Sequence, residues 1–355
     1  IEKLRLATTK SLLERRDVIV VASVSCIYGL GKRKAYEEAV FRFALGDSYE
    51  RRDFLAKLVS NHYDRKDVDL QPGTFRARGG SIEVFPAYSD TALRVYLEED
   101  VIVRIDEIDP LTGKSILSKP NAAVFPAQHY ITSPQAIADA LPRIEEELEE
   151  RLEYFRSRGK LLEAQRLEMR TKYDMEMLTE VGYCSGIENY SRVLDGREPG
   201  ETPGTLLDFF PEDCLFFIDE SHITIPQVQG MYNGDRARKQ TLVDHGFRLP
   251  SCLDNRPLKW EEFYSFLKQA CFVSATPGGW ELNVSSRVAE LIVRPTGVVD
   301  PEVIVIPATG QIDDLTERLR KVTAKGERAL VTTLTKRSAE DLAEHLSEIG
   351  FGVKY

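Results

Sequence analysis

The chain has 355 residues, of which 42% are hydrophobic and 29% are charged, and its formal net charge is −10. This composition is that of an ordinary globular protein, and the length is sufficient for two or three domains. No apolar run is long enough to cross a membrane, and the first ten residues do not have the pattern of a secretory signal.

The five cysteines are scattered along the chain and form no C-x-x-C pair: Cys26, Cys184, Cys214, Cys252 and Cys271. This spacing argues against a zinc site or a disulfide framework and is typical of a protein of the reducing cytoplasm. The acidic net charge does not exclude a nucleic-acid partner, because local basic patches rather than totals steer binding to a polyanion.

The first third of the chain changes from an α/β pattern to an antiparallel β pattern. We expect a helix over residues 1–16 and a strand within 17–29, where β-branched residues follow one another without alternation, as in strands buried on both faces. Residues 74–87 alternate on either side of a Gly-Gly pair, and residues 92–109 alternate around the sequence EED. Each of these two segments predicts a β-hairpin, and together they predict a small antiparallel module inserted into a larger fold.

Residues 135–180 are helical in pattern and highly charged. Apolar residues recur there at spacings of three and four, which predicts one buried stripe on a helix. The stripe consists of Leu141, Ile144, Leu148, Leu152 and Phe155. The sequence SRGK at 157–160 predicts a break before a second helix. The simplest interpretation of such a hairpin is a solvated structural element.

Two further strands are predicted after a turn-rich segment at 197–204. They lie at 215–218 and 271–274, and a basic, irregular segment is expected between them. Residues 294–303 have the composition of a linker. Beyond it another α/β unit is expected, with a helix at 311–324, a strand at 329–334, and a helix that carries Leu342, Leu346 and Ile349. The chain begins with Ile1 rather than Met and stops before this unit could close a core, so we expect a piece of a longer protein.

The sequence Asp219-Glu220-Ser221-His222 follows the first of these two strands directly. Ligands of open α/β sheets bind beyond the carboxyl ends of the strands. An Asp at this position can hold Mg²⁺, and the neighbouring Glu can orient or deprotonate an attacking water. An acidic pair at a strand end is about as often structural, but the combination D-E-S-H after four apolar residues is more specific.

The second strand runs into the sequence VSATPG, which contains Ser274 and Thr276. Their hydroxyl groups could bond back to the acidic loop and so couple the nucleotide state to a movement of domains. The sequence alone is a turn, but its position about fifty residues after D-E-S-H is typical of helicase-type motors.

Such a motor also needs a phosphate-binding loop of the form G-x-x-x-x-G-K-[ST]. Residues 112–115 (TGKS) lack the first glycine, since Ile108 stands there, and they lie between strands of the antiparallel module. Residues 29–34 (GLGKRK) lack both the first glycine and the final hydroxyl residue. We therefore expect the phosphate loop to lie outside this chain.

Two other patterns suggest partner binding. Thr74, Arg76 and Arg78 share one strand face, where two guanidinium groups could recognise carboxylates of a partner protein; a solvated sheet face is the simpler alternative. Residues 232–260 are locally basic and contain interleaved aromatic residues, a combination that suits a single-stranded nucleic-acid path, although a structural loop fits about as well. The basic residues are Arg236, Arg238, Lys239, Arg248, Arg256 and Lys259, and the aromatic residues are Tyr232, Phe247 and Trp260.

Together these stretches resemble the UvrB family of bacterial nucleotide excision repair. The resemblance runs from end to end in the same order, through RRDVIVVASVSCIYGLG, GKLLEAQRLEMRTKYD, CSGIENYSR, FIDESH, MYNGDRARKQTLVDHGFRLPSCLDNRPL, SATPG, RPTG and LVTTLTK. It implies an α/β fold of the superfamily 2 helicase type, with an incomplete parallel-sheet motor domain, an inserted small antiparallel β domain and a helical domain. The implied division is 1–37 and 212–290 for the first motor domain, 38–131 for a β domain that docks on UvrA, 132–211 for the helical domain, and 296–355 for the start of a second motor domain.

The resemblance also implies roles for individual residues. Asp219 would hold magnesium with the nucleotide, Glu220 would activate water, and His222 would link the nucleotide to the motor, with Ser274 and Thr276 in motor coupling. The UvrA-contacting arginines would be Arg65, Arg76 and Arg78. Tyr183, a position that is often Phe in the family, and Phe247 would lie near DNA, beside the basic residues Arg236, Arg238 and Arg248.

The implied activity is ATP-dependent recognition and verification of damaged DNA. ATP and Mg²⁺ would be the cofactors, and the partners would be UvrA, UvrC and damaged DNA in duplex and single-stranded form. This chain alone, without the phosphate loop and the late motor motifs, is expected to be inactive. Two alternatives are a non-catalytic fragment that docks on UvrA and a relative of the transcription-repair coupling factor, which shares the docking module but not the D-E-S-H context.

Overall fold

The computed structural model describes residues 1–293 and 297–355 and divides into two compact units, Ile1–Ser286 and Arg287–Tyr355. Three of the four residues of the sequence RPTG, including the expected domain boundary at 296, lie outside the described residues. In the part of the chain that the structure describes, no helix is both long enough and apolar enough to cross a membrane.

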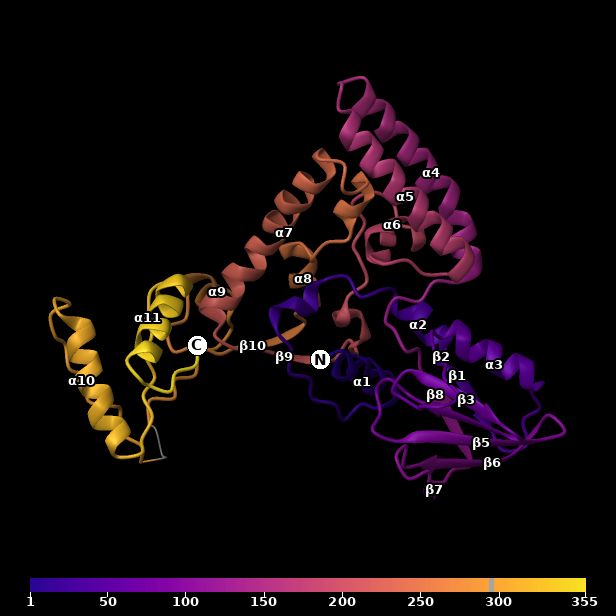
Figure 1. Cartoon of the computed structure of the whole chain (residues 1–355), viewed down its shortest axis with the longest axis horizontal. Helices are drawn as coiled ribbons and strands as arrows, with labels where there is room; N and C mark the ends of the chain where they lie inside the picture. Colours follow the sequence, from indigo (N-terminus) through magenta and orange to yellow (C-terminus); the bar gives the residue numbers. More distant parts are fainter. Residues whose placement is uncertain (294–296) are drawn as a thin grey trace. The chain divides into compact units, whose positions relative to one another are not determined.

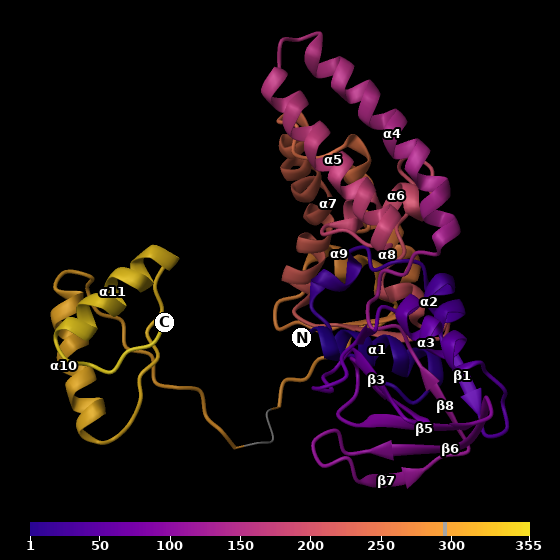
Figure 2. The same ribbon diagram turned by 45° about the vertical axis from the view of Figure 1, so that its right-hand side comes forward.

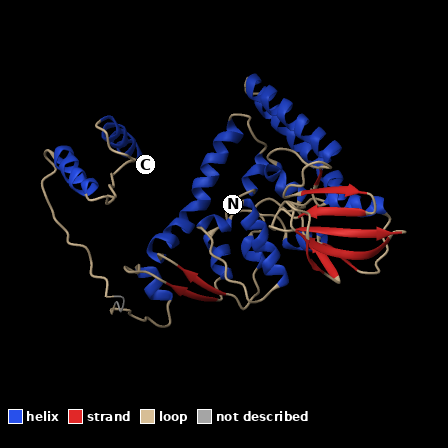
Figure 3. Cartoon of the chain, turned by 60° about the horizontal axis from the view of Figure 1, so that its bottom comes forward, coloured by secondary structure: helices blue, strands red, loops and turns tan. Residues whose placement is uncertain are grey.

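An antiparallel β domain occupies much of the first half of the first unit (Figure 3). Its main sheet has six strands in the order β2-β3-β4-β5-β6-β7, and a separate antiparallel pair joins β1 to β8. The bounds are β1 (Phe41–Ala44), β2 (Asp64–Arg65), β3 (Thr74–Arg78), β4 (Ser81–Phe85), β5 (Ala92–Glu98), β6 (Val101–Ile108), β7 (Ser115–Ser118) and β8 (Asn121–Val124), with helices α2 (Arg33–Ala39) and α3 (Arg51–Ser60) beside them. Both predicted hairpins are confirmed, since β3 pairs with β4 and β5 with β6. Phe54, Phe75, Val84, Val95 and Ile105 are buried in one core between the sheet and α3.

The predicted helical hairpin is also confirmed. Helices α4 (Pro134–Arg156) and α5 (Leu161–Val181) lie side by side in Figures 1 and 2, and the chain reverses at 157–160 as expected. Pro134 stands in the first turn of α4, and the Ser133 hydroxyl caps that turn by accepting the N–H of Ala136 at 3.1 Å. The predicted apolar stripe faces α5: its last four members are buried, and Leu141 packs at the margin. The short helices η2 (Ile187–Tyr190) and α6 (Ser191–Leu194) complete this core.

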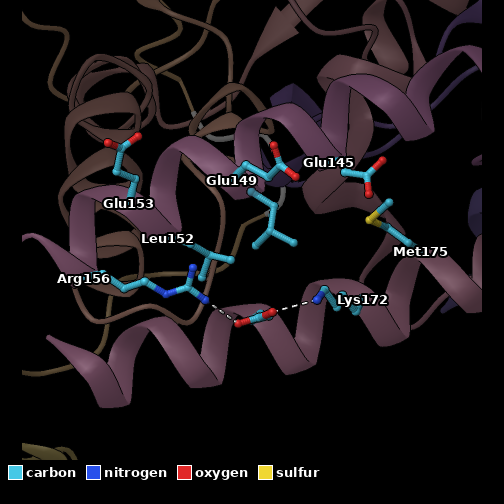
Figure 4. Close-up of a pocket in the computed structure, with 9 residues that line it drawn as sticks. Glu145, Glu149, Leu152, Glu153, Arg156, Lys172 and Met175 are labelled. Atoms are coloured by element: carbon cyan, nitrogen blue, oxygen red, sulfur yellow. Dashed lines mark hydrogen bonds and ion pairs between the residues drawn. The ribbon is translucent and has the colours of Figure 1, made fainter.

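The outer side of the hairpin carries charge. A groove of about 420 Å³ lies between α4 and α5, and glutamates of α4 line one wall (Figure 4). Opposite them Glu168 bridges Arg156 at 2.9 Å and Lys172 at 2.7 Å. These ion pairs lie at the surface, which agrees with a solvated hairpin. Ion pairs at a surface contribute little to stability, so they do not indicate a special role for this groove.

The rest of the first unit surrounds a two-stranded parallel sheet of β9 (Leu215–Ile218) and β10 (Gln269–Phe272). The strand at 215–218 is confirmed, and β10 begins two residues before the predicted strand. The other helices of this part are α1 (Glu2–Glu14), η1 (Val24–Ile27), η3 (Leu206–Phe209), α7 (Ser221–Asp244), η4 (Pro250–Asp254), α8 (Trp260–Phe266) and α9 (Gly279–Val284). The expectation of an irregular segment after 218 was wrong, because α7 continues for 24 residues through Gly230 and Gly234. Burial of Ile225, Val228 and Val243 along one side of α7 outweighs the low helix propensity of the two glycines.

The strand predicted within 17–29 was wrong. Residues 18–23 have no regular structure, and Ile19 and Val21 are more than 90% exposed. A strand of a parallel sheet is stabilised only by the ladder of a neighbouring strand, and within the described residues this segment pairs with neither β9 nor β10. Residues 18–22 are apolar, as the sequence shows, but an apolar composition does not replace the hydrogen bonds of a neighbouring strand.

The second unit contains helix α10 (Gln311–Ala324), as predicted, and helix α11 (Lys336–Glu348), which carries Leu342 and Leu346 as predicted but ends just before Ile349. Leu319, Ala343 and Leu346 are its buried apolar side chains among the described residues. The strand predicted at 329–334 was wrong: the segment is a loop, with Leu330 and Leu334 exposed. Among the described residues of this unit there are two helices and no sheet that such a strand could join.

Candidate functional site

The D-E-S-H sequence forms the sharp turn from β9 into α7. Glu220 adopts a left-handed backbone, with φ 43° and ψ 49°, and α7 begins at the next residue. The Asp219 carboxylate accepts the N–H of Glu220 at 3.0 Å, and the Asp219 carbonyl accepts the hydroxyl of Thr224 at 2.8 Å. Both carboxylates are exposed at the carboxyl end of the strand. An exposed Asp here can offer one oxygen to Mg²⁺, which takes its other ligands from phosphates and water.

The S-A-T turn lies directly against this loop. The Ser274 hydroxyl is 2.7 Å from Nδ1 of His222, and the same nitrogen lies 3.5 Å from Oε2 of Glu220. The Ser274 hydroxyl also accepts the N–H of Thr276 at 3.0 Å, so Thr276 enters the network through its backbone. The Ser221 N–H donates to the carbonyl of Val273 at 3.0 Å. Two motifs about fifty residues apart therefore form one hydrogen-bonded unit.

The two near matches to a phosphate loop have other structural roles. Residues 112–115 form the turn between β6 and β7, where the Asp109 carboxylate accepts the N–H groups of Leu111 and Thr112 at 2.9 and 2.7 Å. Lys32 donates to the carbonyl of Asp195 at 2.6 Å and stands at the start of α2. Their rejection as phosphate loops on sequence grounds therefore agrees with their geometry.

The three arginines of the expected docking face lie on the edge of the β domain. Arg76 pairs with the buried carboxylate of Glu83, which Arg94 also holds at 2.6 Å. Arg78 is exposed and donates to the carbonyl of Asp67, and Arg65 lies 3.3 Å from the Asp67 carboxylate. Phe75 is buried behind them, as the alternation predicts, but Thr74, which was expected to share the face of the arginines, is also buried at 4% exposure.

The basic segment divides into exposed and buried residues. Arg236 and Arg238 are exposed on α7, and Phe247, just beyond the end of α7, is 50% exposed. Lys239 and Arg256, which were expected to belong to the same nucleic-acid path, are only 6% and 2% exposed. Lys239 is paired with Asp235 at 2.8 Å, so burial and pairing remove it from that path.

Tyr183 and Arg248 lie near the helical core. Tyr183 packs against that core, and its ring makes an edge-on contact with His62 at 6.3 Å between centroids. Partial burial raises the pKa of the Tyr183 hydroxyl. Arg248 is partly buried directly after Phe247.

Comparison with known proteins identifies the family. Two family models match the chain, described as the UvrB interaction domain at 41–130 and the UvrB third helical domain at 135–196. The whole chain aligns with proteins named UvrABC system protein B, at 58% identity in Carboxydothermus hydrogenoformans, 56% in Geobacillus kaustophilus and 55% in Chloroflexus aggregans. The chain belongs to the UvrB family. It spans about half the length of these relatives, 54% in each case.

Sequence reasoning missed the buried Arg197 of this UvrB-family chain, and it assigned the buried Arg256 to a nucleic-acid path rather than to a structural role. Arg197 is 1% exposed, and it donates to the Asp195 carboxylate, the Ser191 hydroxyl and the carbonyl of Asp254 at 3.1 to 3.3 Å. The Arg256 guanidinium forms two bonds to the Glu262 carboxylate at 2.7 and 2.8 Å. The sequence DNRPL was a signal of family resemblance, but only the structure shows that its arginine is structural.

The Glu262 carboxylate makes the acid stability of this chain testable. Burial alone would raise its pKa, but the bonds from Arg256, from the N–H of Lys259 and from Thr202 lower the pKa to about 2. Because the folded pKa lies below the unfolded value near 4.5, this stabilisation is complete above pH 4.5 and is lost as the pH falls toward 2. The full shift corresponds to about 3 kcal/mol, and because Glu262 is only partly buried, solvent screening makes the loss of stability smaller than this.

We expect Glu262→Gln to lower the thermal midpoint at neutral pH and to flatten its dependence on pH between 4.5 and 2. The exposed neighbour Glu261 lies on the same helix, so Glu261→Gln serves as the matched control. Thermal unfolding followed by circular dichroism at several pH values measures both variants. Identical pH profiles for the two variants would show that the Arg256–Glu262 pair does not carry this stability.

Proposed function

We propose that this chain is part of a nucleotide excision repair protein that acts in the cytoplasm. The complete protein would use ATP and Mg²⁺, together with UvrA, to load onto distorted DNA, test one strand for damage and prepare incision by UvrC. The observation that carries the proposal is the 58% identity, along the whole chain, to a protein named UvrABC system protein B. We propose the same division of the chain into motor, docking and helical domains that the sequence predicts.

The D-E-S-H and S-A-T unit supports a motor role for the part of the chain around β9 and β10. Asp219 would hold magnesium with the nucleotide and Glu220 would orient the attacking water. His222 would report the state of the nucleotide to Ser274, because the two side chains share a hydrogen bond of 2.7 Å. This bond joins the end of β9 to the end of β10, so it is a route from nucleotide to domain movement.

The β domain supports a docking role. Its core is independent of the motor strands, and the match to a domain described as the UvrB interaction domain covers it. Arg65, Arg76 and Arg78 would meet carboxylates of UvrA, since forked guanidinium groups bind carboxylates with two parallel bonds. The exposed residues Arg236, Arg238 and Phe247, with the partly buried Arg248 and Tyr183, would contact DNA by phosphate neutralisation and stacking.

We expect the double change Arg76→Ala/Arg78→Ala to weaken binding of this chain to UvrA by about 10²-fold or more, since each lost charge-assisted contact costs on the order of 1.5–3 kcal/mol. Surface plasmon resonance with immobilised UvrA measures the loss. Glu83 keeps Arg94 as a partner, so the β domain should keep its thermal midpoint within a few degrees.

The exposed Arg52 of α3 provides a matched control, because Arg52→Ala removes one surface charge from the same domain. Unchanged UvrA affinity in the double variant would remove the docking role of these arginines. Equal losses of UvrA affinity in the double variant and in Arg52→Ala would show that the loss comes from removing positive charge in general and not from specific contacts of Arg76 and Arg78.

A further inference from the structure

Helix α7 ends in a geometry that fixes the backbone of Phe247. The N–H of Gly246 donates to the carbonyl of Val243 at 3.2 Å, and the N–H of Phe247 donates to the carbonyl of Leu242 at 2.9 Å. This pair of bonds, with Gly246 at φ +69°, is the Schellman arrangement that closes many helices. Phe247 therefore leaves α7 in one defined direction.

The helical hairpin supplies cations to the same helix end. Arg151 of α4 donates to the carbonyl of Val243 at 3.3 Å, and Arg166 of α5 donates to the carbonyl of His245 at 2.7 Å. Lys160, between the two helices, lies 3.4 Å from the carbonyl of Asp244. The last carbonyls of a helix have no partner within the helix and carry a partial negative charge, so three cations stabilise this end. In Figures 1 and 2 it is the far end of α7 that lies next to the α4–α5 hairpin, in agreement with these contacts.

Arg166 makes a second contact from the same guanidinium. Its central carbon lies 4.1 Å from the centroid of the Phe247 ring, which is the geometry of a cation over an aromatic face. The bond to the His245 carbonyl fixes one nitrogen of the guanidinium. Because the guanidinium is planar, this bond also restricts its orientation relative to the Phe247 ring. The guanidinium covers one face of the ring, and because Phe247 is 50% exposed, part of this residue remains open to a partner.

We propose that Arg166 is a positioning residue that holds the Phe247 ring as a stacking platform for a nucleobase of single-stranded DNA. The proposal rests on the proposed function, in which Phe247 lies near DNA. Single-stranded nucleic acids bind by stacking of bases on aromatic rings, and a ring that is already fixed loses less freedom on binding. Arg166 itself, with its guanidinium occupied by His245 and Phe247, acts through the ring rather than on the DNA.

The hairpin provides a matched control for the stacked pair. The Arg158 guanidinium lies 3.8 Å from the ring centroid of Tyr154 and donates to the Tyr154 carbonyl at 3.3 Å. Arg158→Ala therefore removes a pair of the same chemical type, and the same charge, from the turn of the same hairpin. It leaves the contacts of Arg166 intact.

The test is a double-mutant cycle on DNA binding by the 355-residue chain. Fluorescence anisotropy of an end-labelled single-stranded oligonucleotide gives Kd for the parent chain, Arg166→Ala, Phe247→Ala and the double variant. We expect Arg166→Ala to weaken binding about 3- to 10-fold and to add nothing in the Phe247→Ala background. Arg158→Ala should bind like the parent. Additive losses, or no loss in Arg166→Ala, would overturn the proposal, because Arg166 would then act alone or not at all.

A second readout separates this inference from the proposed function. With 4-fluorophenylalanine at position 247, the ¹⁹F resonance should shift and broaden in Arg166→Ala and stay unchanged in Arg158→Ala, without any DNA present. An unchanged resonance in Arg166→Ala overturns the positioning role. Failure of the parent chain to bind DNA, together with a shifted resonance, would count against the DNA role of this chain and would support the part of the inference that concerns the ring.

Discussion

We expect the 355-residue chain to release phosphate from ATP at a rate on the order of 10⁻³ s⁻¹ or less. The sequence contains the acidic pair Asp219-Glu220 but no G-x-x-x-x-G-K-[ST] loop. Without backbone N–H groups around the phosphates, and a lysine beside them, the acidic pair has nothing to act on. In related chemistry the loss of one arginine finger alone lowers the rate by about 10³- to 10⁵-fold. A phosphate-release assay with saturating MgATP, with and without single-stranded DNA, measures the rate.

The matched variant for this assay is Glu220→Gln, which keeps the size of the side chain and removes its charge. We expect it to leave the low background unchanged, because water activation contributes only where phosphate is bound. Vigorous turnover by the parent chain that Glu220→Gln abolishes would contradict the prediction. It would mean that residues other than a G-x-x-x-x-G-K-[ST] loop bind the phosphates. The loop between β9 and α7 would then belong to a complete ATPase site within this chain.

Local patterns in the sequence predicted the elements whose stability is local. The β3–β4 and β5–β6 hairpins follow from alternation around short turns, and the α4–α5 hairpin follows from a stripe at helical spacing. The two failed strands, within 17–29 and at 329–334, have equally clear apolar runs. A strand in a parallel sheet depends on partners far away in the sequence, and periodicity carries no information about whether those partners are present.

In the candidate site, too, local sequence patterns predicted some features, while others depend on parts of the chain that are distant in sequence. The D-E-S-H and S-A-T motifs were found from residue types alone, but their hydrogen bond, Ser274 to His222, depends on the pairing of β9 with β10. The basic segment was recognised by composition, which cannot distinguish exposed Arg238 from buried Lys239 one residue later. Arg166 lies about eighty residues before Phe247 and gave no signal, because only the packing of α5 against the end of α7 brings the two together.

The strongest destabilisation is expected from Gly246→Ala. Gly246 has φ +69°, which costs an alanine about 1–2 kcal/mol. A Cβ atom there would lie 2.4 Å from the carbonyl oxygen of Glu163, so α5 would have to move away from α7. We therefore expect the free energy of unfolding to fall by about 2–4 kcal/mol, within the range of a strained backbone combined with overpacking.

The same helix contains a glycine for which the opposite sign is expected. Gly234 lies within α7, and a Cβ atom there would have no heavy atom within 4 Å. Gly234→Ala should therefore raise the free energy of unfolding by about 0.4–1 kcal/mol, since alanine has less freedom to lose on folding. Urea unfolding followed by circular dichroism shows whether the free energy of unfolding falls in Gly246→Ala and rises in Gly234→Ala.

Gly246→Ala should also weaken DNA binding as Arg166→Ala does, since both disturb the Phe247 ring, whereas Gly234→Ala should not. If the free energy of unfolding changed with the same sign and size in both glycine variants, the close approach of α7 to α5 would not be present in solution. The ring would then lack the support that fixes it, and Arg166 would have no defined position from which to hold it.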